Sequence, residues 1–141
     1  MAKYIYLPHT ADAKFRAFGA TLEDAFKNAA YAMTDIITDH TKIDPNMQRK
    51  ISISSEDEKS LLYDFLEQLL ILLDTHGFLL REVKKISILE KKNRLVLIAY
   101  LRGDKHTRRY ETKTTIKAVT YQEMEIKHER GRVTVQVVVD I

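Results

Sequence analysis

The 141-residue sequence contains no cysteine. Disulfide bonds, thiolate nucleophiles, CxxC redox pairs and cysteine-ligated zinc are therefore all excluded. Any metal site must use oxygen ligands or the imidazoles of the five histidines. Glycine is also scarce, with four residues, and neither GxxxxGK(S/T) nor GxGxxG occurs, so a phosphate-binding glycine loop is not expected. GxSxG and HExxH are missing as well, which excludes those enzyme classes.

The sequence also lacks an apolar run long enough to cross a membrane. Its longest apolar stretch, from Leu61 to Leu73, is interrupted by Tyr63-Asp64 and Glu67-Gln68. The first residues, Met1 to Tyr4, lead directly to Pro8-His9 without the apolar segment of a secretory signal. We therefore expect a cytoplasmic protein with no membrane association.

The overall composition is that of an ordinary soluble protein. Hydrophobic residues make up 45% and charged residues 30% of the chain, and its length suits one domain spanning residues 1–141. Lysine and arginine total 23 against 20 acidic residues, which gives a net charge of +3. This excess neither requires nor excludes an RNA partner, because nucleic-acid binders usually concentrate their basic residues on one face.

The spacing of apolar residues predicts two amphipathic helices. Apolar side chains recur at three- and four-residue intervals from Leu22 to Ile37, and Thr21 precedes them as an N-cap. A second helix, capped by Ser55 or Asp57, is expected to run to about Leu73 with a broad leucine-rich face. That face is expected to belong to the hydrophobic core and not to a cofactor pocket.

Most of the remaining chain has the pattern of strands. Segments that alternate or are rich in β-branched residues predict strands at 3–7, 13–18, 49–54, 83–89, 95–101, 124–129 and 132–139. Lys91-Lys92-Asn93 and Arg130-Gly131 are expected to be hairpin turns. The fold class is therefore α+β, a single domain in which two amphipathic helices cover a largely antiparallel sheet.

A first polar cluster separates the first two predicted strands. In Pro8-His9-Thr10-Ala11-Asp12, an imidazole and a carboxylate stand three residues apart in a tight turn and can converge on one small volume. The alternative, and the commoner role for such residues in an arbitrary sequence, is that Asp12 accepts turn N–H bonds and His9 packs nearby, because aspartate is a favoured turn residue.

A second polar cluster lies at the carboxyl end of the valine-rich strand. The side-chain carboxylate of Asp140 stands beside the α-carboxylate of Ile141. Two such anions repel each other unless a cation joins them, and Ca²⁺ or Mg²⁺ prefers these oxygen ligands. The alternative is a frayed terminus in which Asp140 is solvated.

Two basic features are weaker signals. Residues 102–109 are expected to form a short basic loop after a strand, suited to a phosphate, to an acidic protein surface, or simply to solvent. Lys117 lies within the small and apolar segment Ile116 to Tyr121, where most lysines face solvent.

Taken in order along the chain, five segments resemble the archease family, and the likeness covers essentially the whole sequence. The segments are Pro8-His9-Thr10-Ala11-Asp12, Thr21-Leu22-Glu23-Asp24-Ala25-Phe26, the helix from Leu61 to Leu70, Lys117-Ala118-Val119-Thr120-Tyr121, and Asp140-Ile141. The resemblance implies that Asp12, Asp140 and the Ile141 carboxylate form a metal site. It places Lys117 near the same site, and we expect His9 to support the turn.

The resemblance also implies an accessory protein and not a stand-alone enzyme. Archeases act with the RtcB-type RNA ligase, which joins tRNA halves and uses GTP and divalent metal to guanylylate its own histidine. Archease promotes this guanylylation and supports multiple turnover. The expected cofactor here is thus a divalent cation, Ca²⁺ or Mg²⁺, the partner is the ligase, and tRNA is contacted indirectly through it.

Two alternatives come from other functional classes. One is a small RNA-binding or chaperone-like module that uses residues 102–109, although the chain has no RRM-type aromatic motif and no GxxG loop. The other is a metal-dependent hydrolase built on two carboxylates and one histidine. No nucleophile paired with a base can be identified for it in the sequence.

Overall fold

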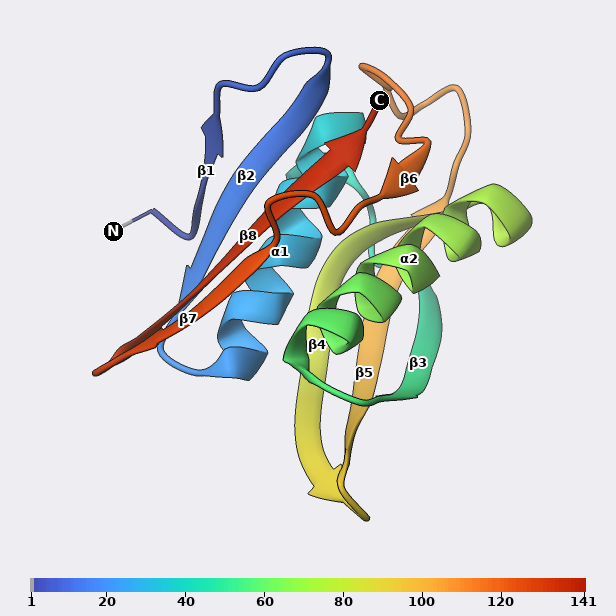
Figure 1. Ribbon diagram of the computed structural model, residues 1–141. Helices are drawn as coiled ribbons and strands as arrows, with labels where there is room; N and C mark the ends of the chain where they lie inside the picture. The colour runs from blue at the N-terminus through green and yellow to red at the C-terminus, as the bar shows by residue number, and fades with distance from the viewer. Residues whose placement is uncertain (1) are drawn as a thin grey trace.

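The computed structural model describes residues 2–141, which form eight strands, two α-helices and one short 3-10 helix (Figure 1). In chain order the elements are β1 (Tyr4–Leu7), β2 (Asp12–Gly19), α1 (Leu22–Ile37), η1 (His40–Lys42), β3 (Met47–Ser55), α2 (Glu58–His76), β4 (Phe78–Lys91), β5 (Arg94–Lys105), β6 (Ala118–Val119), β7 (Glu125–Glu129) and β8 (Arg132–Asp140).

The strands form two antiparallel sheets. In the five-stranded sheet the order begins β1-β2-β8, and both β6 and β7 pair with the other edge of β8. In the three-stranded sheet β5 lies between β3 and β4. The α+β class is confirmed, whereas the expectation of one sheet is wrong. Periodicity within a strand shows which face is buried but not which distant strand pairs with it.

Both helices begin where their capping residues predict. The Thr21 hydroxyl accepts a hydrogen bond from the Asp24 amide at 3.1 Å, and α1 has the predicted bounds. Of the two candidate caps for α2, the carboxylate of Asp57 accepts from the Ser60 amide at 2.8 Å. Ser55 belongs to β3 instead, and its hydroxyl donates to Asp64 at 2.6 Å. Helix α2 extends beyond Leu73 to His76.

The core is one continuous cluster of buried side chains that joins both sheets and both helices. Helix α1 packs on β2 and β4, while α2 lies across the three-stranded sheet. The rings of Phe26 and Phe65 stack with their centroids 6.1 Å apart and so connect the two helices. Neither helix combines the length with the apolar character that a bilayer crossing requires, as far as residues 2–141 are concerned.

The β4–β5 hairpin is longer than predicted at its open end. Strand β5 continues to Lys105, so residues 102–105 are strand residues, and the prediction of a loop over 102–109 is wrong for them. Gly103 makes this extension possible, because a Cβ there would lie 1.9 Å from the Leu79 carbonyl oxygen. At the closed end Lys92 and Asn93 both have positive φ, as a two-residue hairpin turn requires.

Strand β6 was not predicted. It has two residues, too few to show an alternating pattern, yet it fixes the segment before it against β8. The Lys117 amide donates to the Asp140 carbonyl at 2.7 Å, and the Thr120 amide donates to the Val138 carbonyl at 3.2 Å. The end of β8 is therefore paired on both of its edges.

Candidate functional site

The two predicted metal-ligating aspartates are opposed in adjacent strands. Asp12 opens β2, Asp140 closes β8, and the antiparallel register pairs the two residues directly. Residues opposed in this way project their side chains from the same face with Cβ atoms about 4.5–5.5 Å apart. Like charges in this position destabilise a sheet unless a cation lies between them.

The last residue described lies at the same end of the sheet, where β2 begins and β8 finishes; below, this end is called the Asp12–Asp140 edge. Ile141 follows Asp140 directly and is 36% exposed, and Figure 1 shows the C terminus beside β6. Because Asp140 pairs with Asp12 on one side and with Ala118 on the other, this end of the strand is not frayed. Ile141 therefore stands one residue beyond the paired aspartates.

Lys117 is anchored to the site through its backbone. Its amide bonds to the Asp140 carbonyl, while its side chain is exposed. The predicted closeness of Lys117 to the acidic cluster therefore follows from the pairing of β6 with β8. The exposed ammonium is available to a partner at this edge.

His9 lies between two carboxylates. Its Nδ1 is 3.6 Å from Asp12 Oδ2, and its Nε2 is 2.8 Å from Glu123 Oε2. The turn that carries it includes Ala11, whose φ of 65° reverses the chain within a few residues. His9 Nδ1 is buried and has no hydrogen-bond partner among residues 2–141, so its approach to Asp12 is too long to count as a hydrogen bond.

Glu123 is the functional candidate that the sequence did not identify. Its carboxylate bonds to His9 and, at 3.1 Å, to Lys14 Nζ. The hydrogen bond from His9, followed by that from Lys14, lowers the pKa of Glu123 below its ordinary value. Glu123 and His9 are 114 positions apart, so no local pattern could have predicted the contact.

This arrangement fits a hard divalent cation. Two opposed carboxylates offer only oxygen ligands, which Ca²⁺ and Mg²⁺ prefer. The register opposes Asp12 and Asp140 directly, which sets two like charges side by side in the sheet. The assignment of Asp12, Asp140 and Ile141 as metal ligands stays a prediction.

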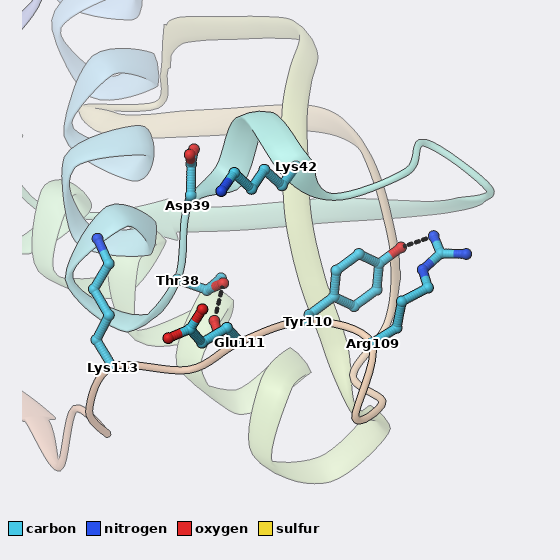
Figure 2. Close-up of a pocket in the computed structure, with 7 residues that line it drawn as sticks. All are labelled: Thr38, Asp39, Lys42, Arg109, Tyr110, Glu111 and Lys113. Carbon is cyan, nitrogen blue, oxygen red and sulfur yellow. Dashed lines mark hydrogen bonds between the residues drawn. The ribbon is translucent and has the colours of Figure 1, made fainter.

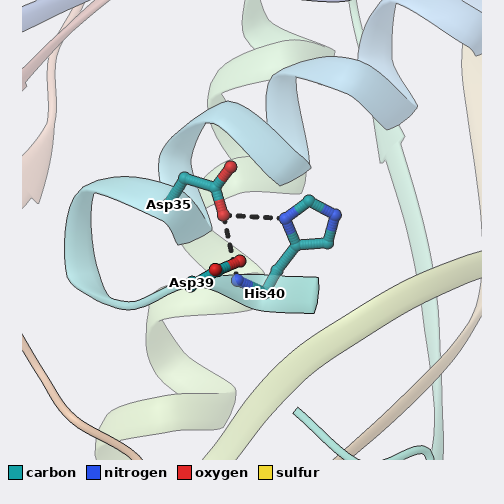
Figure 3. A group of neighbouring side chains, drawn as sticks. All are labelled: Asp35, Asp39 and His40. Atoms are coloured by element: carbon teal, nitrogen blue, oxygen red, sulfur yellow. Dashed lines mark hydrogen bonds and ion pairs between the residues drawn. The ribbon is translucent and has the colours of Figure 1, made fainter. Parts of the chain in front are cut away.

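A second cluster of possible ligands lies at the end of α1 (Figure 3). Single ligand atoms of Asp35, Asp39 and His40 all lie within 4.8 Å of one another. Protein donors already use the Asp35 carboxylate: His40 Nδ1 is 2.7 Å away, the His40 amide donates at 2.9 Å, and Tyr4 donates as well. Burial opposes ionisation of Asp35, but these hydrogen bonds outweigh it and lower its pKa. The cluster therefore fixes η1 to α1.

A cavity of about 400 Å³ opens beside this second cluster (Figure 2). Its lining mixes cations with carboxylates, and two of the cations have partners: Arg109 pairs with Asp44, and Lys113 Nζ donates to the Asp35 carbonyl at 3.1 Å. The Thr38 hydroxyl donates to the Glu111 carbonyl at 2.5 Å and closes the wall. The lining residues are Thr38, Asp39, Lys42, Arg109, Tyr110, Glu111 and Lys113.

Comparison with known proteins decides the family. The model of the Archease protein family (MTH1598/TM1083) matches residues 4–141. The chain belongs to the archease family. The family resemblance predicted from the five sequence segments is therefore confirmed.

Archease relatives match over nearly their full length. Protein archease of Methanosarcina barkeri is 41% identical over 140 residues, which is 99% of this chain and 96% of the relative. Protein archease of Methanothermobacter thermautotrophicus is 38% identical over 141 residues, all of both chains. The solution structure of Methanobacterium thermoautotrophicum protein 1598 has a TM-score of 0.87 at 37% identity, with full coverage of both chains.

A more distant structure has the same fold. The Thermotoga maritima protein described as an archease and possible chaperone has a TM-score of 0.63 and 19% identity, and the match covers 96% of this chain and 94% of that one. At this identity the likeness extends to the fold alone. The architecture of the archease family is thus retained when most residues differ.

Proposed function

We propose that this archease-family protein activates an RtcB-type RNA ligase by promoting guanylylation of the ligase and its multiple turnover. It acts as an accessory protein and not as an enzyme. The observation that carries the proposal is the direct pairing of Asp12 with Asp140 at the edge where the chain ends, in a chain that belongs to the archease family.

In this proposal Asp12, Asp140 and the Ile141 carboxylate hold a divalent cation, Ca²⁺ or Mg²⁺. When bound, the cation supplies concentrated positive charge of the kind that phosphoryl-transfer sites need. The protein's own residues hold this edge in place. Glu123 holds His9 at 2.8 Å, and His9 in turn lies beside Asp12, with Nδ1 3.6 Å from its carboxylate.

The exposed side chain of Lys117 then faces the ligase or the phosphates of its nucleotide. Its position is supported by the 2.7 Å bond from its amide to the Asp140 carbonyl, which keeps the lysine at the Asp12–Asp140 edge. Contact with tRNA is indirect in this proposal and occurs through the ligase.

The alternative of RNA binding through residues 102–109 has less support. Arg109 already has an acidic partner in Asp44, and residues 102–105 are paired in β5 and do not form the predicted loop. A metal-dependent hydrolase also has less support, because the contacts of His9 within residues 2–141 are to the carboxylates of Asp12 and Glu123 and include no hydroxyl nucleophile.

The proposal is tested by ligase guanylylation with GTP, measured with and without this protein. Asp12→Ala is expected to abolish the stimulation, because it removes one of roughly three anionic ligands of a cation held mainly by charge. Asp74→Ala is the matched control, since Asp74 is an exposed aspartate on α2. Full stimulation by a folded Asp12→Ala protein would contradict the mechanism.

A further inference from the structure

The outer face of the three-stranded sheet carries exposed side chains, and among the described residues 2–141 no helix covers it. Side chains alternate along its strands: Ile51 of β3 and Leu101 of β5 are buried, while Lys50 and Tyr100 are exposed. Helix α2 packs on the buried face. The exposed residues therefore form a separate surface, distinct from the edge that carries Asp140.

An aromatic ring stands at the centre of this surface. Tyr100 lies on β5, the middle strand, and is 44% exposed. It pairs in register with Lys50 on one side and with Lys85 on the other. The ammonium of Lys50 lies over the Tyr100 ring, 5.6 Å from its centroid, in a cation–π contact.

A β-bulge adds further positive charge. The register shift between Val83 and Lys85 leaves two consecutive lysines, Lys84 and Lys85, exposed on β4 instead of one. Beside the ring lies a hollow of about 280 Å³ whose cations come from all three strands. On the outer face these are Lys50, Lys84 and Arg102; Arg49 also lines the hollow, but its guanidinium lies over the Phe78 ring on the buried side of β3.

The hollow has little acidic compensation. Within residues 2–141 no carboxylate lines it. Glu82 of β4 lies 3.9 Å from Arg102, and the two side chains are 43% and 33% exposed. Exposed pairs of this kind contribute little and can exchange for a phosphate. The surface therefore combines unneutralised cations with one accessible aromatic ring.

We propose that this outer face binds a single-stranded polynucleotide. A base stacks on Tyr100 in place of the Lys50 ammonium, and the flexible Lys50 side chain turns with Lys84 and Arg102 to the flanking phosphates. Stacking platforms surrounded by cations bind single strands in this way, because an unpaired base offers an open face and a duplex does not. The proposal is independent of the ligase and of the metal site.

The test is fluorescence anisotropy with labelled oligouridine of about 12 nucleotides, a length within the usual range of single-strand sites. Lys50→Ala combined with Lys84→Ala is expected to weaken binding at least about tenfold and to reduce the salt slope by roughly 1.4, at about 0.7 for each phosphate contact. The matched control is Lys3→Ala with Lys59→Ala, an equal loss of exposed charge elsewhere, which should change affinity less than about twofold.

The ring is tested separately. Tyr100→Ala is expected to weaken binding about fivefold or more without changing the salt slope, because stacking releases no counterions. Tyr100→Phe should bind like the native protein. Oligothymidine of the same length shows whether the bound strand is RNA, DNA or either, and each of these outcomes supports a single-strand site.

Other results would overturn the proposal. They are the absence of oligouridine binding by the native chain, an equal loss in the Lys3/Lys59 control, or binding of a hairpin duplex as tight as that of the single strand. Equal binding of a polyglutamate peptide would assign the surface to an acidic protein instead. Circular dichroism and thermal unfolding of each variant show that a loss of binding is not a loss of fold.

Discussion

His9 and Glu123 show how single residues from distant segments define this site. The Nε2–Oε2 contact of 2.8 Å ties the β1–β2 turn to the segment before β7, and Lys14 completes the cluster at 3.1 Å from Glu123. The sequence predicted His9 and Asp12 because they are neighbours in one turn. It could not predict Glu123, because an exposed glutamate has no distinctive sequence context.

Glu123→Gln is expected to lower stability at neutral pH. Bonding to His9 and Lys14 depresses the folded-state pKa of Glu123 below its unfolded value of 4.5. The stabilisation is therefore present above pH 4.5 and is lost as pH falls through the folded-state pKa. Urea unfolding at neutral and at acidic pH should show a gap between native and variant proteins that closes on acidification.

The control for this measurement is Glu125→Gln, an exposed glutamate on β7. It should follow the native protein at both pH values. A gap between the native protein and Glu123→Gln that persists below the titration of the carboxylate would show that the effect is not electrostatic.

At the scale of elements, helices were easier to predict than strands. The bounds of α1 followed from Thr21 and from the apolar spacing, because both signals are local. The two-residue β6 carries no such signal and depends on its partner β8. The early start of β4 at Phe78 depends on Gly103 in the opposite strand, where any Cβ would strike the Leu79 carbonyl.

Asp57→Ala is expected to destabilise the protein by about 1 kcal/mol, because Asp57 and Ser60 satisfy each other's backbone amides at the start of α2. Asp57→Asn should retain most of this stability, since asparagine is an equally good N-cap. Denaturant unfolding measures the difference. Glu56→Ala, one residue before the cap, is the control. Equal unfolding midpoints for Asp57→Ala and Glu56→Ala would show that Asp57 does not stabilise the helix as an N-cap.

On the scale of the whole molecule, one edge of the five-stranded sheet gathers residues from both ends of the chain. Asp12 comes from the start of the sequence, Asp140 and Ile141 come from its end, and the β2–β8 register brings them together. The sequence predicted each cluster by its chemistry and predicted their meeting by family resemblance. Residue patterns alone could not place β2 beside β8.

The most direct test of the central claim is calorimetric binding of Ca²⁺ and Mg²⁺ to the native chain and to a chain extended at Ile141 by a short Gly-Ser tail. The tail replaces the α-carboxylate with a neutral peptide carbonyl, so affinity should fall by at least about tenfold, or ~1.4 kcal/mol. The β7–β8 hairpin should survive, because its pairing is local.

The same Gly-Ser residues inserted at the Lys92-Asn93 turn serve as the control, because that hairpin tip lies at the opposite end of the molecule in Figure 1. The insertion should leave metal affinity unchanged. Tenfold weaker binding by the extended chain alone is the predicted result. Equal affinities in two equally folded proteins would contradict a metal site that uses the Ile141 carboxylate.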